Sequence, residues 1–133
     1  AMAFFHMPPA EFKEAYEKMK LGDHSVIYEH GSIGEKDEYF GISNRPPHFF
    51  EKAVDNGWLK WIFCGHDHLN TLSLTYKGIR MTYGMSIDYL GYSGIAKQYI
   101  QRGATLITRK TNGNIDITMV PLTTVVSTRV RGA

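Results

Sequence analysis

An apolar run that stops at a glycine and continues with two closely spaced histidines constrains this chain more than any other segment. The run extends from Trp61 to Cys64, and Gly65, His66, Asp67 and His68 follow it. A short apolar run bounded by a turn signal is typical of a buried strand. Residues just past the carboxyl end of such a strand line the ligand crevice of an open α/β sheet. The segment therefore predicts an α/β domain in which Gly65 permits a sharp turn and two imidazoles lie at a sheet edge.

A second predicted strand end also carries a histidine. Ala3, Phe4 and Phe5 lead into His6, and prolines follow at positions 8 and 9. Neutral imidazole is the commonest ligand of zinc and also suits iron, nickel and copper. A lone histidine at a strand end is more often a surface residue, so it is the combination of the two strand ends that favours ligation. We expect His6, His66 and His68 to converge and to bind metal.

The pattern around these segments alternates between helix and strand in the first half and becomes β-rich in the second. Apolar spacing predicts a helix from Pro8 to about Leu21 and another from Pro46 to about Asn56, with a long loop over residues 22 to 46 between them. Alternation and turn residues predict hairpins over 72 to 83 and 104 to 120, separated by a loop over 84 to 95 and followed by a tail over 122 to 133. One domain is the natural number for 133 residues, so we predict a single domain over 1–133.

Composition is that of a chain able to bury a core, with 43% hydrophobic and 13% aromatic residues. The formal net charge of +2 and the absence of a basic run argue against nucleic acid or a membrane surface as partner. No stretch approaches the roughly 20 apolar residues of a membrane span. The single cysteine, Cys64, excludes an internal disulfide and is expected to be a small buried strand residue.

Gly65-His66-Asp67-His68 resembles the last signature of the calcineurin-like metallophosphoesterases, and Phe5-His6-Met7-Pro8 resembles the histidine-bearing strand end that precedes it. The longer match is similar to the purple-acid-phosphatase-related branch and covers roughly residues 3 to 121. It comprises Gly65 to Asn70, Tyr83-Gly84, Gly91-Tyr92 and Arg102-Gly103-Ala104.

Intact members of that family also carry an Asp-x-His strand end, a Gly-Asp strand end whose carboxylate bridges two metals, and a Gly-Asn-His segment. The sequence contains no Asp-x-His and no Gly-Asn-His. Its one Gly-Asp, Gly22-Asp23, follows a charged helix and not a buried strand. The resemblance therefore implies the carboxy-terminal half of a metallophosphoesterase α/β sandwich, with a mixed sheet, two helices and carboxy-terminal β-hairpins.

The resemblance also implies the chemistry. In the intact parent, two divalent or trivalent ions (iron, manganese or zinc) flank a hydroxide that attacks the phosphorus of a phosphate ester in line. Carried over, His6 and His66 bind one ion and His68 the other. We expect one ion or none in this chain, no hydrolysis, and self-association through the strand edge at Phe4 and Phe5.

Other polar residues have weaker claims to a function. We predict substrate contacts for His30, beside Gly31 in the long loop, and for Asn70; His24 and His48 are expected to be solvated. Asp67 is either an acceptor that orients an imidazole or an exposed turn residue.

Two alternatives stay open. The chain is a non-catalytic metal-binding or interaction module with three histidines on one ion, or a structural β-rich domain whose histidines bind no metal. For Tyr83, Tyr89 and Tyr92 two roles also stay open, contact with a substrate and packing within the hairpin and loop.

Overall fold

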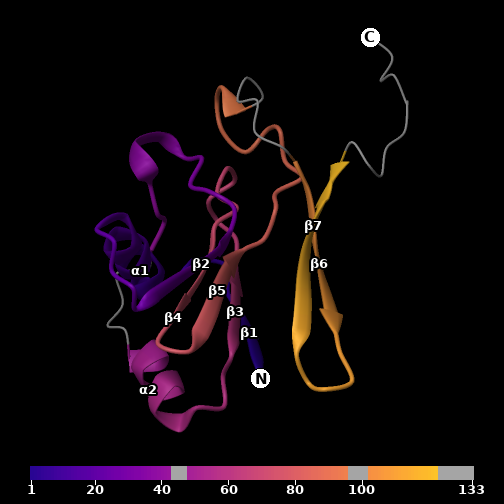
Figure 1. Ribbon diagram of the computed structural model, residues 1–133. Helices are drawn as coiled ribbons and strands as arrows, with labels where there is room; N and C mark the ends of the chain where they lie inside the picture. The colour runs from indigo at the N-terminus through magenta and orange to yellow at the C-terminus, as the bar shows by residue number, and fades with distance from the viewer. Residues whose placement is uncertain (43–47, 96–101, 123–133) are drawn as a thin grey trace. The chain divides into compact units, whose positions relative to one another are not determined.

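The computed structural model describes residues 1–42, 48–95 and 102–122. The chain divides into two compact units, Ala1–Gly84 and Met85–Ala133 (Figure 1). The first unit contains β1 (Met2–Phe4), α1 (Ala10–Lys20), β2 (Val26–His30), the 3-10 helix η1 (Lys36–Glu38), α2 (His48–Asn56), β3 (Trp61–Cys64), β4 (Ser73–Tyr76) and β5 (Ile79–Tyr83). The second contains β6 (Gly103–Arg109) and β7 (Ile115–Pro121). The single domain predicted over the whole chain stays a prediction.

A five-stranded mixed sheet, in the order β1-β3-β5-β4-β2, organises the first unit. Strands β1, β3 and β5 are parallel neighbours, whereas β4 is antiparallel to both β5 and β2. The carboxyl ends of β1, β3 and β5 therefore lie at one edge of the sheet. The predicted α/β class, with a mixed sheet and two helices, is confirmed. In the described part of the chain no helix has the length and apolar character needed to cross a membrane.

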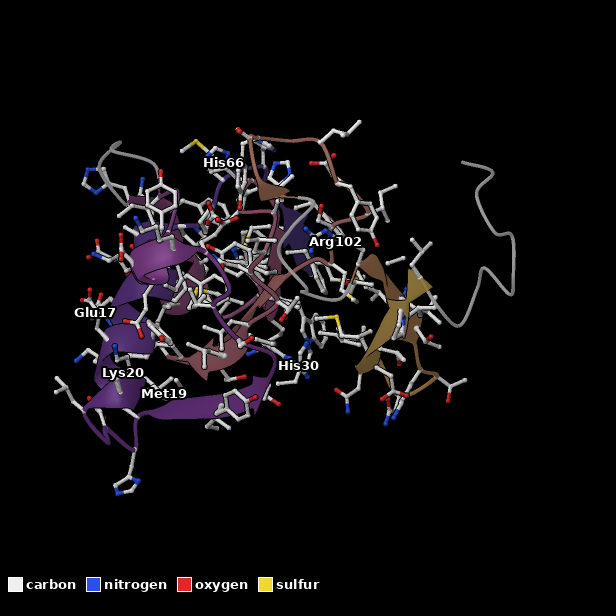
Figure 2. The ribbon with its side chains drawn as sticks, turned by 90° about the horizontal axis from the view of Figure 1, so that it is seen from above. Glu17, Met19, Lys20, His30, His66 and Arg102 are labelled. Carbon is white, nitrogen blue, oxygen red and sulfur yellow. The ribbon has the colours of Figure 1, made fainter. Side chains whose placement is uncertain are left out.

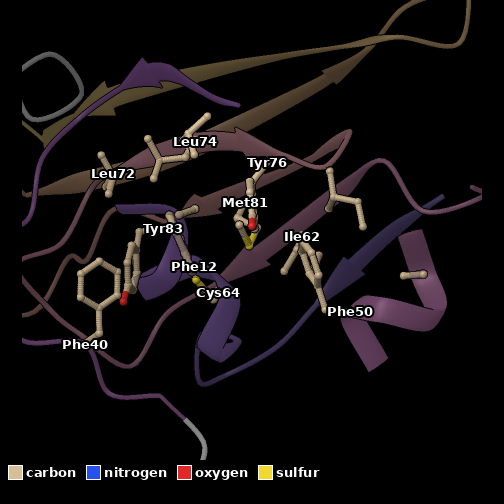
Figure 3. Close-up of a cluster of buried hydrophobic side chains, with 14 of the residues drawn as sticks. Phe12, Phe40, Phe50, Ile62, Cys64, Leu72, Leu74, Tyr76, Met81 and Tyr83 are labelled. Carbon is tan, nitrogen blue, oxygen red and sulfur yellow. The ribbon is translucent and has the colours of Figure 1, made fainter. Parts of the chain in front are cut away.

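One face of this sheet carries the hydrophobic core (Figure 3). Helix α1 places Phe12 against the ring of Tyr83, with 4.9 Å between ring centroids, and Phe50 of α2 stacks on Tyr76. Full burial of a large apolar side chain contributes about 1.5–3 kcal/mol, so this face is the main source of stability. The buried apolar residues of the hairpin recur at alternate positions, as predicted: Leu72, Leu74, Tyr76, Ile79, Met81 and Tyr83. Cys64 is also buried, as predicted.

Both predicted hairpins are present. Strands β4 and β5 are joined by Lys77 and Gly78, which have φ of 48° and 78°. Two central residues with positive φ characterise the tight turn whose twist matches the flanking strands. In the second unit β6 pairs with β7 from Gly103 opposite Pro121 to Arg109 opposite Ile115.

The long loop predicted over residues 22 to 46 is wrong in part, because it contains β2 and η1. Strand β2 lies at the edge of the sheet, and only Val26 is buried, while Ile27 and Tyr28 are more than half exposed. A strand exposed on both faces has no alternation for a sequence pattern to detect. The end of that loop and the start of the predicted second helix, at residues 43–47, and the tail from 123 lie outside the described residues.

We predict that Gly31→Ala destabilises the fold far more than Gly57→Ala. Both glycines have positive φ, so alanine costs about 1–2 kcal/mol at either from backbone conformation alone. At Gly31 the added Cβ would also lie 2.0 Å from the Thr71 carbonyl oxygen, whereas at Gly57 nothing lies within 4 Å. Urea unfolding should give an additional loss of at least about 2 kcal/mol for Gly31→Ala. Equal losses for the two variants would contradict the close packing of residues 31 and 71.

Candidate metal site at the carboxyl edge of the sheet

The parallel ends of β1 and β3 bring His6 and His66 together. The pairing continues past the strands, since the Phe5 amide donates to the Phe63 carbonyl at 2.9 Å and the Gly65 amide to the His6 carbonyl at 3.0 Å. Nδ1 of His66 then lies 3.3 Å from Nε2 of His6, with the two rings nearly perpendicular at 76°. Sixty residues of chain thus separate two imidazoles that are in contact.

The sharp turn after β3 is centred on His66 and not on Gly65. His66 has φ of 69°, and the Asp67 amide donates to the Gly65 carbonyl at 2.9 Å, which closes a three-residue turn. Gly65 is absent from the described residues with positive φ. The predicted sharp turn after the strand is therefore present and begins at Gly65, but its positive φ falls on His66. A non-glycine residue in this conformation is strained and persists only where its surroundings determine it.

Asp67, the last residue of this turn, is buried and fixes the turn through its side chain. Its carboxylate accepts a hydrogen bond from the Tyr83 hydroxyl at 2.5 Å and from the Gly41 amide, at 3.1 Å to Oδ1 and 3.0 Å to Oδ2. Burial raises the pKa of Tyr83, and the bond to Asp67 raises it further, so the phenol stays protonated and donates. The prediction of an exposed turn aspartate is wrong, and Tyr83 does more than pack. The sequence carried no local signal for Gly41.

Asn70 is fully buried and ties the histidine loop to residues 34–39. Its Oδ1 accepts from the amides of Gly34 and Glu35 at 3.0 and 3.1 Å, and its Nδ2 donates to the Tyr39 carbonyl at 3.1 Å. In return, the Leu69 amide donates to Oε1 of Glu35 at 3.0 Å. These bonds give Asn70 a structural role, while its predicted contact with substrate stays a prediction.

His30 ends β2 and lies on the sheet face opposite the hydrophobic core, where it pairs with Ser73 (Figure 2). Its Nδ1 lies 3.1 Å from Nη2 of Arg80, and its Nε2 is buried without a hydrogen-bond partner in the described part of the chain. Burial lowers the pKa of His30, and the adjacent Arg80 guanidinium lowers it further. Nδ1 therefore accepts from Arg80 and the proton resides on Nε2. In Figure 2 His30 lies well apart from His66.

The other histidines do not join the His6–His66 pair into a larger ligand set. Across residues 1–42, 48–95 and 102–122 no group of three or more His, Cys, Asp or Glu side chains is placed to hold a metal ion. His68 is half-buried two residues beyond His66. His24 and His48 are exposed, as predicted.

The His6–His66 pair nevertheless fits one ion. Ligand nitrogens at 2.0–2.1 Å from a tetrahedral ion are about 3.3 Å apart, and the observed separation is 3.3 Å. The distance between the two nitrogens is therefore compatible with a shared ion, and it equally suits a hydrogen bond between the two rings. The described residues therefore bring two imidazoles into contact at the sheet edge, and their binding of metal stays a prediction.

In the second unit, buried Arg102 organises the preceding loop. Its Nε donates to the Asp88 carbonyl at 2.7 Å and its Nη2 to the Ile95 carbonyl at 3.3 Å, and its guanidinium lies 5.1 Å from the ring centre of Tyr89. Tyr89 therefore packs within the loop. Arg102, the first residue of the Arg102-Gly103-Ala104 motif, thus holds that loop through two backbone carbonyls.

Two curated proteins of Arabidopsis thaliana are similar to this chain. "Probable inactive purple acid phosphatase 29" is 28% identical over 91 residues, which cover 68% of this chain and 21% of that protein. "Probable inactive purple acid phosphatase 14" is 38% identical over 47 residues, covering 35% of this chain and 12% of that protein. The chain thus spans a minor part of either relative. No protein-family model matches it, and no solved structure matches it significantly.

The similarity confirms the predicted relationship to the purple-acid-phosphatase-related branch. The chain is a distant relative of those proteins, and it shares with them a segment rather than their whole length.

We predict that His30 makes the stability of the fold fall at mildly acidic pH. Its pKa is lowered in the folded state, so the unfolded chain takes up the proton at higher pH. The contribution of His30 to the free energy of unfolding is therefore fully present above the unfolded pKa of about 6.5. It is lost as the pH falls from there toward the pKa of His30 in the folded state. His30→Gln, which keeps an acceptor for Arg80, should reduce the loss seen by urea unfolding between about pH 7 and 5. His24→Gln, at an exposed site, is the control, and equal pH dependence in all three proteins would contradict the effect of burial.

Proposed function

We propose that this chain carries part of a two-metal phosphoesterase centre, in which His6 and His66 bind one ion and His68 the other. The separation of 3.3 Å between His66 Nδ1 and His6 Nε2 is the observation that supports it most directly. The distant relationship to proteins named as purple acid phosphatases supports the same class. The mixed sheet with its two helices corresponds, in this proposal, to one half of a metallophosphoesterase sandwich.

Iron, manganese or zinc ions, when bound in such a centre, stabilise negative charge on the oxygens of a phosphate ester. The part played by this chain is to hold imidazole nitrogens at the sheet edge. The substrate contact predicted for His30 has no support from the geometry, because its Nε2 is buried and the residue lies well apart from His66. Asn70 uses both ends of its amide within the loops, so it would act on substrate through the loop that it holds.

The chain by itself is proposed to be inactive. Holding two dications about 3.5–4 Å apart requires anionic ligands between them, and no group of three or more His, Cys, Asp or Glu side chains in the described residues is placed to hold an ion. The two relatives also carry the word "inactive" in their names. One weakly held ion is the expected state.

A second candidate is a non-catalytic module that binds a single ion or a protein partner. The observation favouring it is the same incomplete ligand set. A phosphoesterase part needs further ligands from another polypeptide segment, whereas the module needs none. Restoration of hydrolysis by such a segment would separate the two candidates.

The open edge of β1 is the proposed place of contact with another chain. Strand β1 pairs with β3 on one side and, among the described residues, has no strand on its other side. Large apolar side chains are exposed around it: Met2, Phe4, Phe5, Met7, Phe49 and Trp58. An open strand edge beside exposed apolar groups favours pairing with another strand. A second copy of this chain can supply that strand.

We predict that the purified, tag-free chain binds about one zinc ion and hydrolyses no aryl phosphate. Isothermal titration should show at least about tenfold weaker binding for His6→Ala and for His66→Ala, equivalent to 1.4 kcal/mol, because each removes one of two ligands. His24→Ala, which removes an exposed histidine, should bind as the wild type does. Hydrolysis is measured with added manganese, zinc or iron.

Two results would contradict this proposal. Zinc binding that is unaffected by both His6→Ala and His66→Ala would remove the histidine pair as a ligand site. Robust turnover abolished by His66→Ala would show that the chain contains a complete active site.

We predict that the chain self-associates at micromolar concentration and that Phe4→Lys makes it monomeric. Phe4 is 64% exposed, and lysine at a strand edge opposes pairing with a second strand. Sedimentation velocity measures the change, and Leu21→Lys, at an 88% exposed leucine after α1, is the matched control. A wild-type monomer would contradict association through β1 and favour the non-catalytic module.

A further inference from the structure

We propose that Asp67 is a positioning residue that fixes the His66 imidazole toward His6 by bonding to Gly41 and Tyr83. This inference rests on the proposed metal-binding role of the histidine pair. It assigns a role to a residue that is not itself a ligand and that contacts neither substrate nor ion.

The carboxylate of Asp67 is held from two independent segments. Tyr83, at the end of β5, donates its hydroxyl at 2.5 Å, and Gly41, from the connection after η1, donates its amide to both carboxylate oxygens. Tyr83 is itself fixed, because it is fully buried and stacks on Phe12. Asp67 follows His66 directly, so these bonds fix one side of the strained turn.

Gly41 also contacts the imidazole itself. A Cβ built on Gly41 would lie 2.0 Å from Cδ2 and 2.5 Å from Nε2 of His66. The Cδ2–Nε2 edge of the ring therefore lies directly against the Gly41 backbone, while Nδ1 faces His6 at 3.3 Å. The ring is confined between a glycine backbone on one side and its partner imidazole on the other. The bond from Gly41 to Asp67 keeps that backbone in place.

A purely structural role is the competing explanation. Asp67 satisfies buried donors, so its loss would destabilise the fold even if His66 kept its place. The two roles differ in what they predict for the histidine pair at temperatures where every variant is folded. A positioning role changes the geometry of the pair and its affinity for metal, whereas a structural role changes the unfolding midpoint alone.

The experiment compares Asp67→Ala, Asp67→Asn and Tyr83→Phe with the wild type, well below their unfolding temperatures. Tyr76→Phe is the matched control, since Tyr76 is a buried tyrosine of the same sheet whose hydroxyl donates to Glu14 at 2.8 Å, away from the loop. Zinc affinity is measured by titration calorimetry. The nuclear Overhauser effect between the ring protons of His6 and His66 is measured without metal.

We expect Tyr83→Phe and Asp67→Ala to weaken zinc binding by about tenfold or more and to reduce the His6–His66 Overhauser effect, as loss of groups that orient a ligand does. Asp67→Asn keeps an acceptor oxygen and should retain most of both signals, and Tyr76→Phe should retain all of them. If Asp67→Ala does not fold, Tyr83→Phe decides. Unchanged affinity and Overhauser effect in Tyr83→Phe would overturn the inference. A wild type that binds no zinc would contradict the proposed function, and the Overhauser comparison would still decide the role of Asp67.

Discussion

The parallel pairing of β1 with β3 is the interaction on which the candidate site depends. Strand β1 is three residues long and lies at the sheet edge, yet its register with β3 sets His6 beside His66. The ring of Phe4 stacks on that of Phe63, its register partner, with 5.1 Å between centroids. A slip of one residue would turn His6 to the other face of the sheet. The position of His6 in the pair therefore depends on a short edge strand, the two backbone hydrogen bonds that extend its pairing, and one aromatic contact.

Strong periodicity made most of the fold predictable. The buried run of β3, the alternation across Lys77 and Gly78, and the helical spacing of Phe12 and Ala15 each correspond to the observed element. Strand β2 escaped prediction because its pairing with β4 comes from backbone hydrogen bonds at an exposed edge. Such bonds leave no hydrophobic pattern in the sequence.

The sequence predicted the histidines of the site but not the residues that hold them in place. His6 and His66 follow strand ends, which a sequence pattern can locate. The Gly41 amide and the Tyr83 hydroxyl reach Asp67 across 26 and 16 residues of sequence. No local motif marks a partner at such a separation, because folding alone makes the two segments neighbours. The left-handed conformation of His66 was missed for a related reason, since the adjacent Gly65 is the residue that sequence rules favour there.

The strain at His66 bears on how the pair would bind an ion. A left-handed non-glycine residue costs about 1–2 kcal/mol, while a hydrogen bond to a charged group contributes roughly 1.5–3 kcal/mol. Asp67 accepts such bonds from both Tyr83 and Gly41, so they are sufficient to offset the strain without any metal. The loop is then ordered before an ion arrives, and binding need not supply that ordering. In the proposed site the number of ligands would then limit the affinity for metal, and a segment that carries further ligands and pairs with the open edge of β1 would place them beside His6.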